Sequence, residues 1–308
     1  MAKLLIVGGT GFFGKSILTY LSNNRLRKKF ELIYILSKKK KINKENTNNL
    51  TIQSINKNLL DIKKIPNVKY IIYLAKLKNS IQDIKAAKNF VKILKKNNYK
   101  KKIYFLYISS GAVYGQISKN KLINENYLLK NKRKKYLNPQ KEDYSYAKIT
   151  CENIFLNCNI NNIDLRIARC FTFTGEYLND KNFAIVEFIK SILAKKKITL
   201  KSNYGVYRSY MHSKEMSKWL MNILLKKNLR NQIFNVGSED KIELSKLANI
   251  LALRFNIFLI NKKKIKKKID FYVPSVFRYK RVFKFEKKQS SLEAILTTIK
   301  NINHAKIY

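Results

Sequence analysis

The feature that most constrains the fold is an alternation of short apolar runs with amphipathic stretches along the first half of the chain. The apolar runs are short enough for buried strands, and the stretches near residues 15–23 and 81–94 have helical periodicity. Strands that alternate with helices form a parallel sheet covered on both faces, so we predict an α/β fold with a doubly wound (Rossmann) sheet. The strand-like runs are Leu4–Val7, Leu32–Leu36, Tyr70–Leu74, Ile103–Ile108 and Ile163–Ala168.

The rhythm becomes less regular beyond Phe171, which sets the predicted domain boundary. A helix is expected over 183–194, and an isolated strand over 232–236. We predict a dinucleotide-binding Rossmann domain over 1–170. A smaller α+β lobe, mainly substrate-binding, is expected over 171–308, with a segment that returns to the Rossmann sheet. A length of 308 residues fits one large α/β unit with a smaller second lobe.

The charge of the chain is extreme, with 65 Lys+Arg against 19 Asp+Glu and a net charge of +46. A hydrophobic content of 45% excludes a disordered polyelectrolyte. Lysine, asparagine and isoleucine are over-used in all parts of the chain, which indicates compositional drift rather than selection of one binding face. No nucleic-acid recognition motif accompanies the charge, so no specific nucleic-acid partner is expected.

The cysteine and histidine content argues against a disulfide framework and against a metal site. There are three cysteines, without C-x-x-C spacing, and the only histidines are His212 and His304. We therefore expect a reduced, cytoplasmic protein without a metal cofactor. No apolar stretch reaches the roughly 18 residues of a membrane span, so no such span is expected.

A glycine-rich turn follows the first strand directly and opens onto a helix. Gly8, Gly11 and Gly14 frame the turn, and Phe12 and Phe13 begin the helix. Glycine permits a sharp turn and close backbone approach, and a helix N-terminus presents free N–H groups to a pyrophosphate. This placement predicts a dinucleotide site for NAD or NADP.

The end of the second strand bears on the choice between these two cofactors. An acidic side chain there favours NAD, whereas a basic neighbourhood accommodates the extra phosphate of NADP. This chain has Ser37 and Lys38 at that point, with no carboxylate to repel a phosphate. The sequence therefore leans slightly toward NADP.

Two further stretches carry catalytic residue types. Ser110 follows the strand over 103–108, and about thirty residues later Tyr144 and Lys148 are spaced i,i+4. On a helix this spacing places the phenol and the ammonium on one face, where the cation favours phenolate and brings a group of ordinary pKa about 10 toward working pH. Such a tyrosine can exchange a proton with a sugar hydroxyl while hydride moves at the same carbon.

The glycine turn, the stretch over 109–115 and Tyr-x-x-x-Lys, in this order, resemble the extended short-chain dehydrogenase/reductases of the NAD-dependent epimerase/dehydratase family. The resemblance covers nearly the whole chain and implies a nucleotide-diphosphate hexose as substrate. It implies that Ser110 hydrogen-bonds the reacting hydroxyl and that Tyr144 is the acid/base. Lys148 would bind the nicotinamide ribose and lower the pKa of Tyr144.

The resemblance extends to positions around the cofactor and the substrate. Arg208, in R-S-Y-M-H, resembles the arginine that grips the nucleotide diphosphate, and a guanidinium fork matches phosphate oxygens bidentately. Arg169 stands where an asparagine usually follows the sixth strand, which changes an expected substrate contact. The positions expected to contact the cofactor after the third and fourth strands are Asn58, Leu59, Leu74 and Ala75.

The residues after Ser110 decide which reaction we expect. The family's 4,6-dehydratases have an Asp-Glu pair there, whereas this chain has Gly111 and Ala112. A site without that pair is equipped for hydride and one proton, so dehydration is disfavoured. We predict a nucleotide-sugar epimerase that works through a transient 4-keto hexose. The alternative is an NADPH-dependent reductase of a nucleotide-linked 4-keto-6-deoxyhexose.

Two interpretations from other classes stay open. A non-catalytic NADP-binding protein would keep the glycine turn without needing the serine, tyrosine and lysine together. A polyanion-binding protein would be driven by the charge and would bind nucleic acid in a salt-dependent way. The family resemblance also makes a homodimer an expectation.

Overall fold

The computed structural model describes residues 1–38, 49–97, 99–130, 133–180, 182–202, 204–261, 266–284 and 289–307. The chain divides into two compact units. The first comprises residues 1–113, 136–170 and 217–234, and the second comprises residues 114–135, 171–216 and 235–308. Residues 114–135, inside the predicted first domain, thus belong to the second unit.

A seven-stranded sheet is the centre of the first unit, with the strand order β11-β6-β5-β4-β1-β2-β3. The pairings among β1 to β6 are all parallel, which confirms the predicted doubly wound fold. The strand over 232–236, β11, lies at the edge of this sheet beside β6. The bounds are β1 Ala2–Val7, β2 Phe30–Ser37, β3 Ile52–Asn56, β4 Tyr70–Tyr73, β5 Ile103–Ser110, β6 Ile163–Cys170 and β11 Gln232–Val236.

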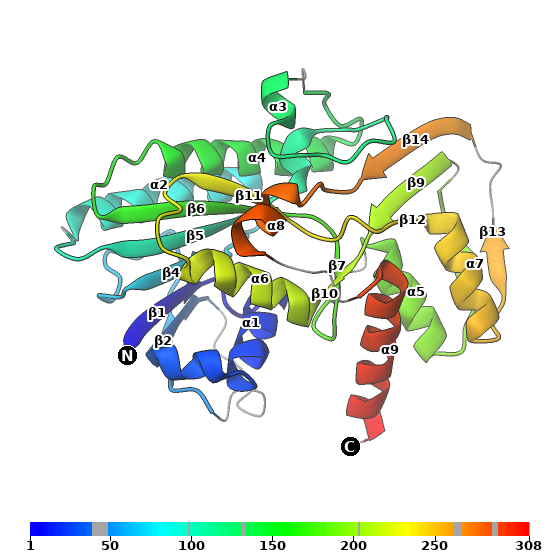
Figure 1. The fold of residues 1–308 in the computed structure, drawn as a ribbon, viewed down its shortest axis with the longest axis horizontal. Helices are drawn as coiled ribbons and strands as arrows, with labels where there is room; N and C mark the ends of the chain where they lie inside the picture. The colour runs from blue at the N-terminus through cyan, green and yellow to red at the C-terminus, as the bar shows by residue number, and fades with distance from the viewer. Residues whose placement is uncertain are drawn as a thin grey trace. The chain divides into compact units, whose positions relative to one another are not determined.

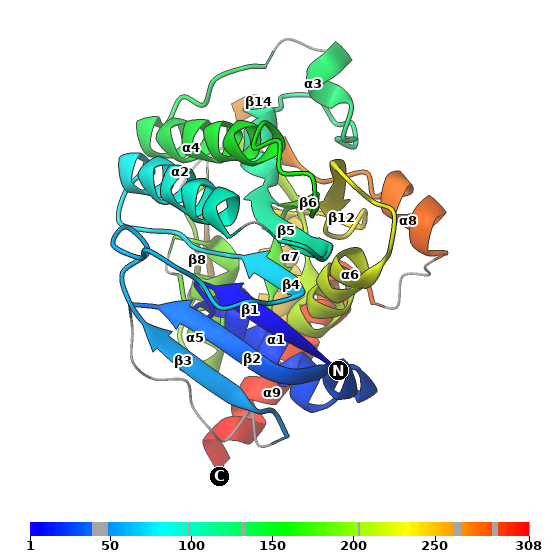
Figure 2. The ribbon, with the colours of Figure 1, turned by 90° about the vertical axis from the view of Figure 1, so that its left-hand side faces the viewer.

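Helices cover both faces of this sheet (Figure 2). Helices α2 (Ser80–Lys96) and α4 (Pro139–Leu156) pack together on one face, and α1 (Phe12–Ser22) and α6 (Ser213–Leu225) lie on the other. Strand β5 is buried along its whole length, which explains its continuous apolar run. The core on the α2 and α4 face includes Phe90, Phe105 and Phe155.

Strand β3 is absent from the runs that the sequence pattern singled out. It pairs only with β2 and forms the edge of the sheet. Three of its five residues are exposed, and its sequence is Ile-Gln-Ser-Ile-Asn. An edge strand needs no continuous apolar run, so hydrophobic patterning does not reveal it.

The second unit is built from small sheets and helices (Figure 1). Strand β9 (Tyr204–Ser209) pairs with β12 (Lys241–Glu243) and β14 (Lys266–Tyr272). Helix α5 confirms the helix predicted over 183–194. The other bounds are α3 Tyr127–Lys130, β7 Phe173–Thr174, α5 Ala184–Leu193, β8 Ile198–Leu200, β10 Met211–His212, α7 Leu244–Arg254, β13 Leu259–Asn261, α8 Phe277–Phe283 and α9 Ser291–Ile307.

The structure shows the state of the cysteines and the character of the helices. Cys151, Cys158 and Cys170 are buried and free. Burial raises the pKa of the Cys151 thiol to about 11, which keeps it protonated and unreactive. In the described ranges, no helix has both the length and the apolar character required to cross a bilayer.

Candidate active site

The glycine turn has the geometry of a phosphate cradle. Gly8 has φ +82°, and a Cβ there would lie 2.7 Å from the Cα of Ala75. At Gly14 a Cβ would collide with the carbonyl oxygen of Gly9. The backbone at Gly8 has a conformation that favours glycine, and neither Gly8 nor Gly14 has room for a side chain.

The first turn of α1 begins without a side-chain cap. Gly11 is the N-cap residue and has no side chain to accept a hydrogen bond from the helix. Helix α1 begins at Phe12, and the rings of Phe12 and Phe13 lie edge to face with centroids 5.4 Å apart. An uncapped N-terminus of this kind fits the pyrophosphate of a dinucleotide.

The ends of the neighbouring strands bring other predicted cofactor residues to the same edge of the sheet. The N–H of Leu74 donates to the carbonyl of Val7 (2.8 Å), and that of Gly8 donates to the carbonyl of Leu36 (2.8 Å). Ala75 is therefore packed against the turn. Ser37 is the last residue of β2, and Lys38 is exposed beside it.

Asn58 and Leu59 follow β3 and already have intramolecular contacts. The Asn58 side-chain oxygen accepts a hydrogen bond from the N–H of Leu60 (3.3 Å). Leu59 is buried in the core of the first unit. Their proposed contacts with the cofactor stay a prediction.

Tyr144 and Lys148 lie on one face of α4, one turn apart. The Lys148 Nζ is 5.8 Å from the centroid of the Tyr144 ring, and it donates to the carbonyl oxygen of Ile108 (3.1 Å). Lys148 is only 7% exposed, so this bond to β5 holds a buried cation. A second cation, which the sequence did not single out, lies near the phenol: the Lys76 Nζ is 5.2 Å from the Tyr144 ring.

Ser110 is tied to the same region through the loop that follows it. It is the last residue of β5, and its Oγ accepts a hydrogen bond from the N–H of Ala112 (3.1 Å). The hydroxyl of Ser145, the residue after Tyr144, donates to the carbonyl oxygen of Ala112 (2.7 Å). These bonds hold the first half of α4 against the loop that carries Ser110.

Arg169 lies inside β6 and not after it, because the strand continues to Cys170. The guanidinium is bound to both carboxylate oxygens of Glu152, at 3.0 Å and 2.7 Å. Glu152 also accepts a hydrogen bond from the hydroxyl of Ser109 (2.5 Å). A direct contact between Arg169 and substrate would require this buried pair to open, and that contact stays a prediction.

Sequence reasoning missed Glu152, although a signal for it exists. Tyr144, Lys148 and Glu152 are spaced i, i+4 and i+8, so all three lie on one face of α4. A residue two positions after β6, Thr172, also went unnoticed. The hydroxyl of Thr172 is buried and has no hydrogen-bond partner among the described residues.

Arg208, in the second unit, is paired with Asp270. One nitrogen donates to the carboxylate of Asp270 (2.8 Å), and another donates to the backbone carbonyl oxygens of Tyr207 (2.8 Å) and Asp270 (3.0 Å). The guanidinium also lies 5.7 Å from the ring centroid of Tyr272. Burial lowers the pKa of Arg208, but Asp270 outweighs that effect and the net shift is upward. Arg208 is thus a fixed cation.

The chain is similar to a family of known proteins. The model of the NAD dependent epimerase/dehydratase family matches residues 4–237. A dTDP-D-glucose 4,6-dehydratase of Dictyostelium discoideum is 28% identical over 265 residues, which are 78% of this chain and 59% of that relative. The chain thus spans about three fifths of the relative's length.

Solved structures with the same fold include dehydratases and epimerases. A dTDP-glucose 4,6-dehydratase from Bacillus anthracis, in complex with NAD, has a TM-score of 0.80 and 16% identity, with 100% of this chain and 98% of that one covered. A UDP-N-acetylglucosamine 4-epimerase from Methanobrevibacter ruminantium has a TM-score of 0.75 and 21% identity, with 99% of each chain covered. At these identities the likeness shows the fold, and the reaction must be argued from the residues of the site.

Proposed function

Because the chain belongs to the NAD-dependent epimerase/dehydratase family, we propose that it is an NAD(P)-dependent nucleotide-sugar epimerase that works through a transient 4-keto hexose. The observation that supports this most is the arrangement around α4 in the first unit. Lys148 is buried below the ring of Tyr144 and bonded to β5, and Ser145 links the same helix to the loop after Ser110.

In this proposal each residue of the site has one task. Tyr144 acts as a phenolate that takes the proton from the reacting hexose hydroxyl, and the resulting phenol returns the proton after the sugar has rotated. Ser110 donates a hydrogen bond to the same oxygen, and Lys148 places a positive charge beside the phenol. A nicotinamide cofactor held by the turn over 8–14 would supply the hydride chemistry.

The residues present fit a dinucleotide, and we assign the pyrophosphate to the turn over 8–14. This assignment rests on the positive φ of Gly8 and on the uncapped first turn of α1. Ser37 and Lys38 offer no carboxylate to repel a 2′-phosphate, so NADP is expected to bind at least as well as NAD. Titration of the purified protein with both cofactors tests this expectation.

For the substrate we assign the diphosphate to Arg208 and a hydroxyl contact to Thr172. Asp270 holds the guanidinium of Arg208 in place, 2.8 Å from its carboxylate. The buried hydroxyl of Thr172 has no described partner, so a ligand oxygen would satisfy it. Arg208→Ala is expected to raise KM for the nucleotide sugar far more than it weakens cofactor binding.

The choice of epimerisation rests on Gly111 and Ala112, which supply no acid or base beside Ser110. The dehydratase relative at 28% identity keeps dehydration open as a second candidate. Mass spectrometry after incubation with UDP- and dTDP-hexoses separates the reactions. An epimer has the mass of the substrate, a dehydration product is lighter by one water, and a reductase needs added NADPH and a 4-keto sugar. We expect an unchanged mass with an altered retention time, and loss of water would overturn the epimerase.

Tyr144→Phe removes the proposed acid/base and is expected to abolish turnover while cofactor binding persists. Tyr146→Phe is the matched control. It also removes a tyrosine hydroxyl from α4, two residues after Tyr144, and the side chain of Tyr146 is 59% exposed. Retained turnover in Tyr144→Phe would reject the proposed role, and equal loss in both variants would point to a general effect on α4.

We also propose a homodimer. Ile81 on α2 and Tyr146 on α4 are large apolar side chains with 66% and 59% exposure, on two helices that pack side by side. Exposed apolar groups on adjacent helices suit a contact with a second copy. Light scattering of the purified protein gives the mass. A monomeric wild type would reject the homodimer, and a dimer that Ile81→Lys leaves intact would reject this surface.

A further inference from the structure

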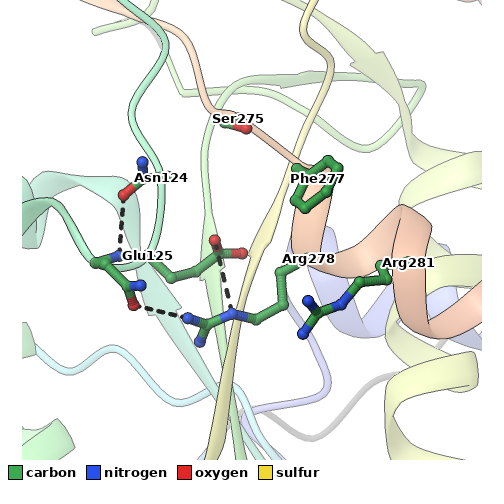
Figure 3. Close-up of a pocket in the computed structure, with 7 residues that line it drawn as sticks. Asn124, Glu125, Ser275, Phe277, Arg278 and Arg281 are labelled. Atoms are coloured by element: carbon green, nitrogen blue, oxygen red, sulfur yellow. Dashed lines mark hydrogen bonds and ion pairs between the residues drawn. The ribbon is translucent and has the colours of Figure 1, made fainter.

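The second unit contains a pocket of about 340 Å³ whose lining shares no residue with the proposed active site (Figure 3). Three segments line it: residues 124–126, residues 275–278 and Arg281. Its volume is at the lower end of the roughly 300–1,000 Å³ found for small-molecule sites. The pocket is therefore of a size for a small organic ligand.

Arg278 is held in place from two sides. Its Nη2 donates to the side-chain oxygen of Asn126 (2.7 Å), and its Nε lies 3.9 Å from the carboxylate of Glu125. The side chain of Glu125 is only 4% exposed, and it also accepts a hydrogen bond from the N–H of Asn235 (2.8 Å). The negative charge of Glu125 is thus already compensated, and it fixes a guanidinium at the pocket.

Arg281 adds a second guanidinium one helical turn further along α8. It is exposed and makes no hydrogen bond or ion pair within the described part of the chain. Lysine outnumbers arginine 55 to 10 in this sequence, so composition does not account for two arginines in one pocket. A guanidinium, unlike an ammonium, can bind a phosphate or carboxylate through two parallel hydrogen bonds.

Phe277 supplies an aromatic face beside these charges. Its side chain is 67% exposed, and it lines the pocket together with both arginines (Figure 3). Asn124 and Asn126, which carry amide side chains, also line the pocket. Amide groups can bond to the polar edge of a ring whose face rests on the phenylalanine.

We propose that this pocket binds a small organic anion with a planar ring, of the class of a nucleoside monophosphate. The anionic group lies on Arg281 and Arg278, and the ring lies against Phe277. With two guanidinium groups and one carboxylate, the pocket has an excess positive charge that only an anion neutralises.

The test is calorimetric titration of the full chain with uridine monophosphate, inorganic phosphate and uridine. Arg281→Ala is expected to weaken the pocket's affinity for uridine monophosphate by about tenfold or more, since a charge-assisted hydrogen-bonded contact is lost. Phe277→Ala should weaken the binding of uridine monophosphate and leave the binding of inorganic phosphate unchanged. Arg254→Ala, at an exposed position on α7, is the matched control for loss of one positive charge.

Comparing the variants also corrects for uridine monophosphate that binds outside the pocket. Uridine monophosphate bound at the proposed active site is the same in all three variants, so only the difference between Arg281→Ala and Arg254→Ala reports on the pocket. Equal affinities in these two variants would overturn the proposal. It would also be overturned if Phe277→Ala had no effect on uridine monophosphate, because the ring would then make no contact with the pocket.

Discussion

Two arginines three residues apart on β6, Arg166 and Arg169, are both buried and both bound to a carboxylate, yet they serve different parts of the first unit. Side chains alternate along a strand, so residues three apart point to opposite faces of the sheet. Arg166 donates to the carbonyl oxygens of Ile223 (2.6 Å) and Leu224 (2.7 Å), in the last turn of α6. Arg169 instead binds a residue of α4.

The difference between the two pairs lies in what else they touch. Arg166 satisfies carbonyl groups that the end of a helix leaves without partners, and its own carboxylate, Asp164, is two residues away on the same strand. Glu152, the partner of Arg169, accepts a hydrogen bond from the hydroxyl of Ser109, which precedes Ser110 in the chain. The same chemistry therefore anchors α6 on one face and borders the proposed catalytic residues on the other.

The largest expected effect is on the stability of the α6 face. Arg166→Met leaves the buried carboxylate of Asp164 with the half-exposed Lys102, 3.4 Å away, as its one described cation, and it leaves two carbonyl oxygens without donors. We therefore expect the free energy of unfolding to fall by about 3–5 kcal/mol. Urea denaturation measures this loss. Turnover per folded molecule should stay within about twofold, because α6 carries no proposed catalytic group.

A second variant keeps this prediction testable if Arg166→Met does not accumulate. In the double variant Asp164→Asn with Arg166→Met, no buried charge is left unpaired, so part of the lost stability should return. A double variant that is less stable than Arg166→Met would contradict the ion-pair explanation.

On the α4 face, replacing the carboxylate of Glu152 by an amide should lower turnover as well as stability. Glu152→Gln weakens the hold on Arg169 and Ser109, so we expect kcat to fall by about tenfold while KM for the nucleotide sugar changes by less than about twofold. Glu152 is a positioning residue in this prediction. Steady-state kinetics with the substrate identified by mass spectrometry gives both constants.

Asp164→Asn is the matched control for Glu152→Gln, because both replace a buried carboxylate that holds an arginine of β6. Both variants should lose stability, and only Glu152→Gln should lose kcat. Equal kcat values in the two variants, measured per folded molecule, would make the Glu152 pair purely structural.

The sequence alone predicts those features of the two faces that depend on the local spacing of residues. Tyr144 and Lys148 stand one turn apart on a helix, β5 begins with a long apolar run, and apolar residues recur along β6, so local patterns predict these elements. The partner of Glu152 is set by the pairing of β5 with β6, which brings Ser109 opposite Arg169. No local pattern encodes that register. The same holds for Arg208, whose partner Asp270 is 62 residues away.

A carboxylate in the second unit, Glu176, is expected to have a smaller effect on stability, because unlike the ion pairs of β6 it is partly exposed to solvent. The side chain of Glu176 is 29% exposed, lies 3.5 Å from His212 and accepts hydrogen bonds from Ser213 and Asn301. Burial raises the pKa of Glu176, but the nearby His212 and the hydrogen bond from Asn301 outweigh it and lower the pKa to about 2, against an ordinary value of 4.5.

A folded-state pKa below the unfolded value stabilises the protein above pH 4.5, and the contribution disappears as the pH falls toward 2. We expect Glu176→Gln to remove about 1–2 kcal/mol at neutral pH, a range reduced for solvent screening. The variant should approach the wild type as the pH falls, as measured by urea denaturation at a series of pH values. A difference between the two proteins that stays constant from pH 7 to about pH 2.5 would show that Glu176 acts through packing and not through its charge.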